Sequence, residues 1–403
     1  MFNLKRIAPY GLLGLIAASA AEAAATRNAF IDAFATARGN AFTATADNAS
    51  AVFYNGAGLT QLEGSELRGG AFSISLGYEF ESDIAAGTDE MDDGFQVVPA
   101  FFAAHKFKDY PLALGFGIYA PFALGSDWTE DASFAADPRV PYDARLAYVK
   151  YHAVLAWQLT DTLSVAAGLS YDDAEVDVKA TALEFDGTDQ AVGYSLSVLW
   201  QPTEQHGFGL NYQAKTETTL DGTVSGPAIL AATQGATGSL DSKAELSFPE
   251  SIVFGYAYRP NEKWDFEFNL DWTNWDRVDR LSLDAIPGLG YELNWESAFI
   301  WEAGVTRFFD GGWYLSGGYT FVENAVPDDD FLPIVPDSDR HFFALGLGRS
   351  HDRFRWQITY QQAFAGERSV SGNNLEVAPG ASTLNGDWDL DSQAVAFSLG
   401  YRF

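Results

Sequence analysis

Apolar and polar side chains alternate residue by residue in one segment after another of this chain. In residues 264–273 one face of the alternation holds Trp264, Phe266, Phe268, Leu270 and Trp272, and the other holds Asp265, Glu267, Asn269, Asp271 and Thr273. A period of two is typical of a β-strand whose two faces meet different surroundings. No helical pattern between these segments could cover the apolar faces, so we expect lipid to cover them. The pattern predicts an all-β fold, a transmembrane antiparallel β-barrel.

Counting the alternating segments gives about 14 strands, an even number as in bacterial outer-membrane barrels. We expect them near 66–80, 95–107, 111–124, 145–159, 163–179, 190–201, 207–220, 242–259, 263–276, 296–309, 312–324, 339–350, 353–367 and 391–403. The connections alternate between tight turns and longer loops. The longer loops are expected at 81–94, 125–144, 180–189, 221–241, 277–295, 325–338 and 368–390. This alternation is typical of periplasmic turns and external loops.

The first residues have the pattern of a secretory signal peptide. Lys5 and Arg6 are followed by a short apolar stretch over 7–17, and small residues at 23–25 offer a cleavage site after Ala25. We therefore assign 1–25 to a signal peptide. The chain has no cysteine, and 15% of its residues are aromatic. No later segment approaches the length of a membrane-spanning helix. These features indicate the outer membrane of a Gram-negative bacterium.

Composition and motifs also exclude several functions. A net charge of −31 argues against nucleic acid, whose phosphates need Lys and Arg. The acidic loops are best interpreted as a solvated surface, with divalent-cation binding as the alternative, and they lack the spaced Asp pattern of a specific calcium site. We predict no metal site and no cofactor. The five histidines have no serine nearby in a recognisable nucleophile context. A barrel enzyme of the lipase or protease type therefore remains only an alternative, and we expect no catalytic residues.

The last strand ends in an alternating aromatic pattern. Leu399, Tyr401 and Phe403 share its apolar face, and Phe403 is the final residue. This ending resembles the recognition signal that barrel-assembly machinery reads. We expect these residues to direct insertion, with lipid and lipopolysaccharide around a monomeric barrel of residues 66–403.

The segment before the first strand is rich in Ala, Gly and Asn and has no long apolar face. Ahead of a closed barrel, residues 26–65 are best interpreted as a hatch that fills the lumen. Within it, the Asn55-Gly56-Ala57 stretch forms a turn. The Asn55 amide needs buried hydrogen-bond partners, which we expect on the wall beside the third strand. A hatch disfavours the other alternative, a general water-filled porin.

Three sequence blocks resemble the long-chain fatty acid transporter family of outer-membrane proteins (FadL type), which includes aromatic-hydrocarbon channels. They are the hatch residues 47–59, the Ser-Phe-Pro-Glu-Ser and Asp-Trp-Thr-Asn-Trp segments at 247–251 and 271–275, and the Val-Pro-Asp-Ser-Asp-Arg segment at 335–340. The family usually has Asn-Pro-Ala where this chain has Asn55-Gly56-Ala57, and Gly56 predicts a more flexible turn. The resemblance covers the whole mature chain.

The resemblance implies a passive channel that takes up hydrophobic molecules and releases them sideways into the bilayer through a gap near the third strand. Gly115, Gly117 and Pro121 are the candidates for this gap, and Pro121 also interrupts a β-ladder on physical grounds because it has no N–H to donate. The basic groups that meet a fatty carboxylate in the family have only candidate equivalents here. These are Lys179, Arg277 and Arg280. Because the ninth strand is acidic on its lumen face, the ligand stays open between fatty acids and neutral aromatics or alkanes.

Overall fold

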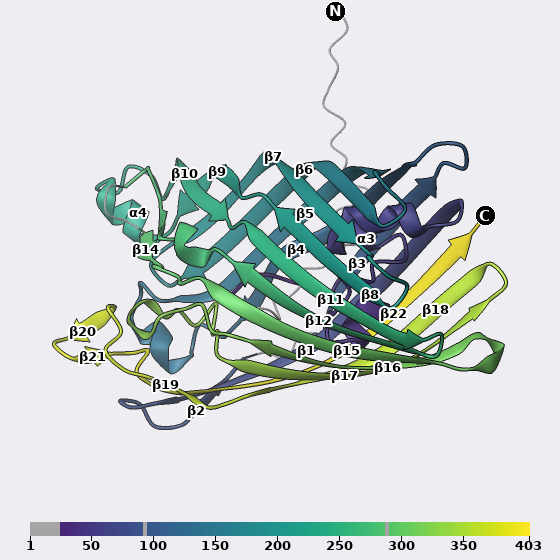
Figure 1. Cartoon of the computed structure of the whole chain (residues 1–403). Coiled ribbons are helices and arrows are strands. Elements are labelled where there is room, and N and C mark those ends of the chain that lie inside the picture. Colours follow the sequence, from purple (N-terminus) through teal and green to yellow (C-terminus); the bar gives the residue numbers. More distant parts are fainter. Residues whose placement is uncertain (1–24, 92–94, 287–289) are drawn as a thin grey trace, which may run out of the picture.

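The alternating segments pair into one sheet that closes on itself (Figure 1). The computed structural model describes residues 25–91, 95–286 and 290–403. Strand β1 (Ser65–Ser82) pairs antiparallel with β3 (Phe95–Lys106) on one side and with β22 (Gly386–Arg402) on the other. The result is a closed 14-strand antiparallel barrel, which confirms the predicted fold class.

The other strands of the barrel follow one another around the ring. They are β4 (Leu112–Asp127), β5 (Pro141–Gln158), β6 (Leu163–Ala180), β7 (Glu184–Trp200), β8 (His206–Gln213) continued by β9 (Thr216–Ser225), β10 (Ser239–Phe248) continued by β11 (Ser251–Asn261), β12 (Trp264–Thr273), β15 (Ala298–Phe308), β16 (Trp313–Val322), β17 (Arg340–His351) and β18 (Phe354–Ala365). Two positions in the ring are thus occupied by interrupted strands. Pro249, which cannot donate to a ladder, lies in the second interruption.

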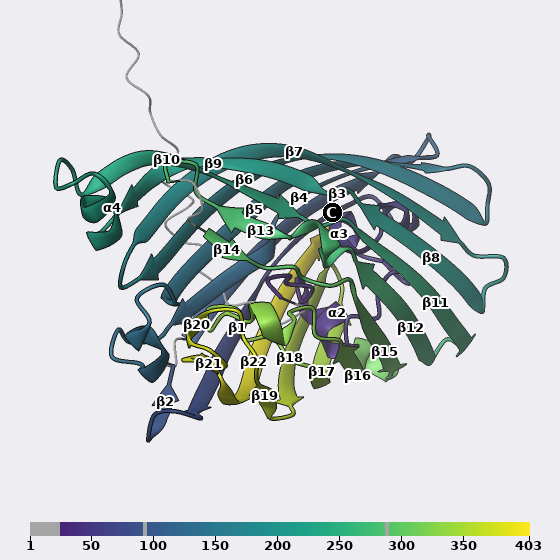
Figure 2. The same cartoon turned by 90° about the vertical axis from the view of Figure 1, so that its left-hand side faces the viewer.

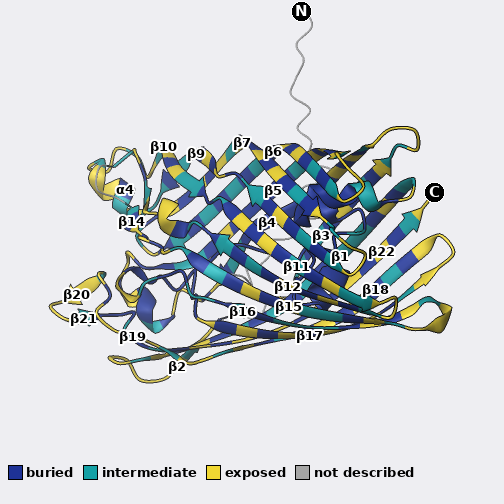
Figure 3. Ribbon diagram, in the orientation of Figure 1, coloured by how far each residue is buried: buried dark blue, intermediate teal, exposed yellow. Residues whose placement is uncertain are grey.

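The two faces of the strands meet the two environments that the alternation predicts. On β12 the polar residues from Asp265 to Thr273 are buried toward the lumen, whereas Phe266 and Phe268 are exposed on the outside. Figure 3 shows the same alternation of buried and exposed residues along neighbouring strands. Lipid can cover the outer face, because it exposes aromatic and aliphatic side chains.

Short turns lie at one end of the barrel and longer connections at the other (Figure 1). The longer connections contain β2 (Thr88–Glu90), η2 (Ser133–Ala136), α4 (Pro227–Ala232), η3 (Trp275–Arg277), β13 (Arg280–Ser282), β14 (Gly290–Glu292), η5 (Asp328–Asp330), β19 (Arg368–Val370), β20 (Glu376–Ala378) and β21 (Ala381–Ser382), and one short turn contains η4 (Asp310–Gly312). The predicted loop at 180–189 is wrong, because β6 and β7 pair as far as Lys179 and Glu184. No helix among the described residues is long and apolar enough to cross a membrane.

Residues 25–64, which we call the hatch, lie inside the ring of strands (Figure 2). The hatch contains α2 (Ala33–Ala37), α3 (Ala51–Tyr54) and η1 (Gly56–Gln61). Helix α2 begins after Asp32, whose carboxylate accepts a hydrogen bond of 3.0 Å from Phe34 N. Almost every hatch residue is buried, so the hatch occupies the lumen. The predicted signal peptide lies outside the described residues, except for Ala25.

Candidate functional site

Four ion pairs hold the hatch to the wall, and the hatch supplies the base in two of them and the acid in the other two. Two hatch arginines meet acids on β12, Arg27 with Asp271 at 2.7 Å and Arg38 with Asp265 at 3.2 Å. In the other two pairs the charges are reversed, and a hatch acid contacts an arginine of the wall. These pairs are Asp32 with Arg68 on β1 at 2.6 Å and Asp47 with Arg355 on β18 at 3.4 Å.

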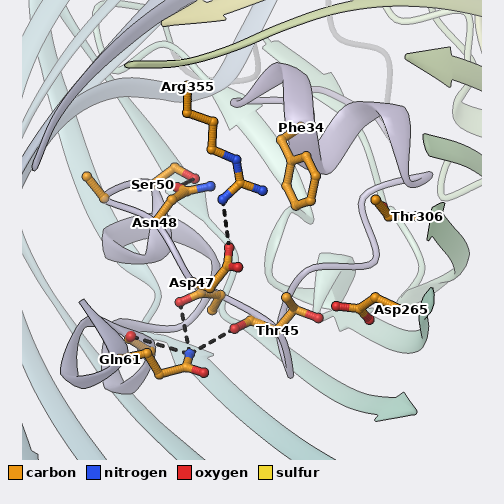
Figure 4. Close-up of polar contacts among 12 residues, drawn as sticks. Phe34, Thr45, Asp47, Asn48, Ser50, Gln61, Asp265, Thr306 and Arg355 are labelled. Carbon is orange, nitrogen blue, oxygen red and sulfur yellow. Dashed lines mark hydrogen bonds and ion pairs between the residues drawn. The ribbon is translucent and has the colours of Figure 1, made fainter. Parts of the chain in front are cut away.

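The ion pair of Asp47 and Arg355, drawn in Figure 4, is more exposed to solvent than the other three. The Asp47 side chain is 38% exposed, so solvent screens the pair. Burial raises the pKa of the Asp47 carboxyl, but the guanidinium of Arg355, with further arginines, outweighs burial and holds this pKa below its ordinary value. Asp47 is therefore ionised at neutral pH.

The hatch backbone also touches the wall directly. A Cβ atom added to Gly304 on β15 would lie 2.4 Å from Arg38 O, and one added to Gly318 on β16 would lie 1.8 Å from Gly39 N. Gly39 itself has φ +58°, a conformation that favours glycine. Three glycines thus allow a tight hatch turn to lie against the strands.

The predicted hatch residues lie against a different part of the wall from the one expected. The Asn55 amide donates to Val198 O on β7 at 2.9 Å and to Thr43 O in the hatch at 2.8 Å, and its oxygen accepts from Ala57 N at 3.1 Å. Asn55 therefore finds the buried partners it needs, but on β7 and not beside the third strand of the barrel, β4. Helix η1, which begins after Asn55, packs mainly across β5, β6 and β7 and less on β3 and β4.

Gly56 has a steric role in addition to the flexibility that the sequence predicts. A Cβ atom there would lie 2.6 Å from Val154 Cγ1 and 3.3 Å from Ala166 Cβ, both on the wall. A side chain at this position fits only if the hatch or the Val154 side chain moves. Ala57 beside it is completely buried.

The third strand leaves its neighbour halfway along the barrel. Pairing between β3 and β4 ends at Phe101 and Ile118, and β4 has an irregularity at Ala120–Pro121 in its pairing with β5. Beyond that point the hatch occupies the unpaired side of β4. Asn28 N donates to Pro121 O at 2.8 Å, and Ala123 N donates to Thr26 O at 2.9 Å.

Gly115 and Gly117, which the sequence suggested for the gap, lie in the part of β4 that is still paired with β3. Gly115 and Gly117 are regularly paired with Ala104 and Phe102 of β3. A Cβ atom on Gly115 would lie 2.6 Å from a Leu59 methyl of the hatch. These glycines make room for hatch and wall side chains, whereas Pro121 lies at the interruption itself.

An apolar cavity of about 80 Å³ lies on the loop side of this interruption. Thr26 of the hatch and Leu124 of β4 form part of its lining. The remaining lining residues come from β5, β6, β10, the segment after β12 and the loop over residues 323–339: Ala144, Arg145, Leu146, Val176, Val178, Leu246, Ser247, Phe248, Trp275, Val278, Leu281, Tyr291, Leu293, Trp295, Val326, Asp330, Leu332, Ile334 and Val335. We call this space the apolar cavity.

A smaller polar cavity of about 40 Å³ lies on the other side of the hatch segment at residues 26–28. Its lining includes Arg27, Pro121, Lys150, Asp271 and Glu302. Because Thr26 lines the apolar cavity and Arg27 the polar one, this hatch segment separates the two spaces.

The loop over residues 323–339, which we call the inner loop, is fixed above the apolar cavity by one arginine. Arg368 Nη2 donates to Asp328 Oδ1 at 2.6 Å and to Val326 O at 2.7 Å, and its guanidinium lies 4.9 Å from the centre of the Phe331 ring. Asp337 Oδ2 accepts from Ala325 N at 2.9 Å and from Ala25 N at 3.0 Å. The inner loop is thus attached both to β19 and to the hatch.

The structure does not bring the three carboxylate candidates into the apolar cavity. Lys179 pairs with Asp143 at 2.8 Å, Arg277 with Glu250 at 3.7 Å and Arg280 with Glu292 at 3.1 Å. Each of the three basic side chains is about half exposed. Arg145, the basic residue that the lining does contain, is exposed on the outer face of β5.

The residues of the predicted assembly signal lie on the outside of the last strand. Leu399 and Phe403 are exposed, and the Tyr401 ring lies 4.9 Å from the Phe354 ring of β18. Phe403 N donates to Ser65 O at 3.0 Å, next to the closure of the barrel. No group of three or more His, Asp or Glu side chains among the described residues could hold a metal ion.

The sequence prediction did not include the charged residues that fix the hatch. Arg27, Arg38 and Asp32 stand in a segment with no recognisable motif of their own. The sequence did contain an indication of these residues. A strand with acids at 265, 267 and 271 on its lumen face needs basic side chains inside the barrel to pair with them.

Comparisons with known proteins agree with this architecture. Residues 14–403 match the family model described as outer membrane protein transport protein (OMPP1/FadL/TodX). The chain is 24% identical to the putative outer membrane protein NMB0088 of Neisseria meningitidis serogroup B, over 85% of this chain and 87% of that protein.

Solved structures share the fold. A Pseudomonas aeruginosa FadL homologue superposes with a TM-score of 0.79 at 15% identity, covering 96% of this chain and 100% of the other. The Pseudomonas putida toluene transporter TodX gives a TM-score of 0.71 at 13% identity, covering 96% and 100%. The family consists of transport proteins and not of enzymes, which confirms that expectation. The chain belongs to the OMPP1/FadL/TodX family of outer-membrane proteins that transport hydrocarbons and fatty acids.

Proposed function

We propose that the chain is a passive channel for small hydrophobic molecules, which pass from the apolar cavity through the interruption beside β4 into the bilayer. The observation that carries this proposal is the position of the apolar cavity. Thr26 lines the cavity and also accepts the hydrogen bond from Ala123 that occupies the unpaired side of β4. Movement of this one hatch segment would connect the cavity with the gap between β3 and β4.

Such a channel needs no energy source. Transfer of an apolar molecule from water into lipid is favourable by about 0.8 kcal/mol for each CH₂ group. The protein has only to offer an apolar path past the polysaccharide of the outer leaflet. The lining of the apolar cavity offers aromatic and aliphatic side chains for this path.

The candidate substrates are fatty acids and neutral hydrocarbons. The name of the TodX neighbour connects this fold with toluene, and the family model connects it with FadL. Binding of a ligand carboxylate by the three basic candidates requires that ligands first contact the loops outside the cavity. These candidates are Lys179, Arg277 and Arg280. Each of them would have to exchange an acidic partner for the ligand.

The proposal also includes the oligomeric state of the barrel, its lipid contacts and its assembly. The barrel closes within one chain, which supports a monomer in contact with lipid and lipopolysaccharide. The exposed aromatic ending at Phe403 supports recognition by barrel-assembly machinery.

An uptake panel in a strain that lacks the protein tests the channel. Fatty acids, toluene-like aromatics, alkanes and small hydrophilic solutes are supplied separately, with and without the gene restored. We expect restoration to increase uptake of at least one hydrophobic class and to leave hydrophilic solutes unchanged. Restoration of hydrophilic uptake alone would instead favour a general porin.

A further inference from the structure

Two arginines on the outer face of the barrel are held by aromatic rings. The guanidinium carbon of Arg307 on β15 lies 5.1 Å from the ring centre of Trp264 on β12 and 5.0 Å from that of Phe309. The guanidinium carbon of Arg349 on β17 lies 5.1 Å from the ring centre of Trp313 on β16. A ring attracts a cation over its face and takes up none of its hydrogen-bond donors as an oxygen acceptor would. We call these five residues the arginine belt.

The two arginines of the belt have no acidic partner. Neither forms an ion pair with any acid of residues 25–91, 95–286 and 290–403, although the chain has 55 acidic and only 24 basic residues. Arg349 Nε donates to Gly311 O at 3.1 Å, and its other donors are free for a further partner. Asp310 and Glu262, in neighbouring turns, are exposed and contact neither arginine. The chain therefore leaves two positive charges on its outer face for a partner of opposite charge.

The belt lies at the edge of the apolar surface of the barrel. Arg307 is paired in register with Leu315 on β16, and Leu347 precedes Arg349 by two residues on the same face of β17. Both leucines are exposed on the outside. Beyond the belt the chain turns at η4 and at residues 351–353, where the side chains are exposed and polar. The arginines are thus at the depth where lipid acyl chains end and headgroups begin.

We propose that Arg307 and Arg349 each bind the phosphate group of a membrane phospholipid at the turn end of the barrel. Turns of outer-membrane barrels face the periplasm, so this lipid belongs to the periplasmic leaflet. A guanidinium presents its N–H donors in a planar fork that matches two oxygens of a phosphate. The acyl chains of the same lipid then lie along the exposed Leu315 and Leu347. The site lies on the outside of the wall and does not depend on a ligand path past the hatch.

The position of the belt favours a phospholipid over other sources of phosphate. Lipopolysaccharide occupies the outer leaflet, at the loop end of the barrel, whereas the belt is at the turn end. A free phosphate ion would meet the same two guanidinium groups, but it has no acyl chain to cover the exposed leucines beside them. A phospholipid satisfies both the charged and the apolar part of this surface.

Native mass spectrometry of the purified full-length barrel, released from a non-ionic detergent, tests the proposal. Dioleoylphosphatidylglycerol and dioleoylglycerol are titrated separately, because the two have the same acyl chains and only the first has a phosphate. We expect the wild-type barrel to bind the phospholipid more tightly. Arg307→Gln and Arg349→Gln should each weaken phospholipid binding about fivefold and leave dioleoylglycerol binding unchanged.

A matched control removes one positive charge from the same end of the barrel. Lys108 lies exposed in the turn between β3 and β4, away from the belt, so Lys108→Gln should change phospholipid binding by less than about twofold. Arg307→Lys keeps the charge and loses the planar fork, and it should bind the phospholipid more weakly than wild type. Heat-modifiable migration shows that each variant is folded before its binding is compared.

Three outcomes would overturn the proposal. Equal weakening by Lys108→Gln and by the two belt variants would mean that any positive charge at this end attracts the lipid. Dioleoylglycerol binding as tightly as the phospholipid to wild type would exclude recognition of the phosphate. Displacement of the phospholipid by an equimolar amount of inorganic phosphate would identify the free ion as the partner. All three leave the channel itself untouched, because the uptake panel tests it separately.

Discussion

The close approach of the hatch to the wall at Gly318 can be tested with a single methyl group. Gly318→Ala adds a Cβ atom that points into the lumen at the hatch turn. The neighbouring residue on the same strand supplies the control, because a Cβ atom on Gly317 would have Ala344 O, at 3.9 Å, as its nearest contact. The two variants have the same composition and β-propensity, and they differ in the face that receives the methyl group.

The size of the effect follows from the contact distances. The added Cβ on residue 318 would lie 1.8 Å from Gly39 N, where real Cβ contacts do not fall below 3.0 Å, so one of the two backbones must move by about 1.2 Å. The strand is held on both sides by the ladders to β15 and β17, so the hatch turn is the part that yields. Overpacking of this kind costs about 1–3 kcal/mol. The population of displaced hatch should therefore rise about 5- to 150-fold.

Limited trypsin digestion of the purified barrel measures this displacement. Arg38, next to the turn, is completely buried in the native barrel and becomes a cleavage site when the turn moves. We expect faster cleavage after Arg38 in Gly318→Ala than in Gly317→Ala, at equal heat-modifiable barrel, and higher single-channel conductance in planar bilayers. Equal cleavage rates and equal conductance in the two variants would refute the close packing of hatch and wall at this position.

Three further changes test other parts of the molecule. Asn55→Ala removes hydrogen bonds to Val198 O and Thr43 O, about 0.5–1.5 kcal/mol each, and should leave the barrel assembled while changing hydrophobe uptake; unchanged uptake at matched outer-membrane levels would contradict this role. Pro121→Val restores an N–H at the interruption of β4 and should slow hydrophobe release into lipid, as measured by transfer into vesicles; release at the wild-type rate would argue against a sideways path through this gap. Phe403→Asp places a charge on the outer face of the last strand and should sharply reduce heat-modifiable barrel in outer-membrane fractions, whereas wild-type amounts would exclude Phe403 from the insertion signal.

Period-two alternation predicted the barrel because both faces of a strand are readable from neighbouring residues. The same rule explains where the prediction was wrong. At residues 184–190 the buried face holds Phe185 and Gly187, and the exposed face holds Glu184, Asp186 and Thr188. An outer face in water is polar, so a strand that projects beyond the lipid has the composition of a loop.

The candidate site was harder to predict because it depends on contacts between distant residues. Thr26, Leu124, Trp275 and Ile334 line one cavity and come from four separate parts of the chain. The sequence indicated one component, the interruption at Pro121, since the effect of proline on a ladder is local. Nothing local distinguishes Trp275 from the other tryptophans of the chain. Its place in the lining of the apolar cavity becomes visible only when its neighbours are in position.

The charges of hatch and wall together determine how the hatch lies in the lumen. Arg27 and Arg38 face the acids of β12, whereas Asp32 faces Arg68 on β1, near the other side of the ring. A buried ion pair adds little net stability, but a hatch turned the other way would place like charges together and leave each one unpaired, at about 3–5 kcal/mol for each broken pair. The orientation of the hatch therefore follows from the inward-facing charges of the strands. Since that orientation puts Thr26 beside the interrupted strand, the same charges determine where the apolar cavity ends and where a path out of it can begin.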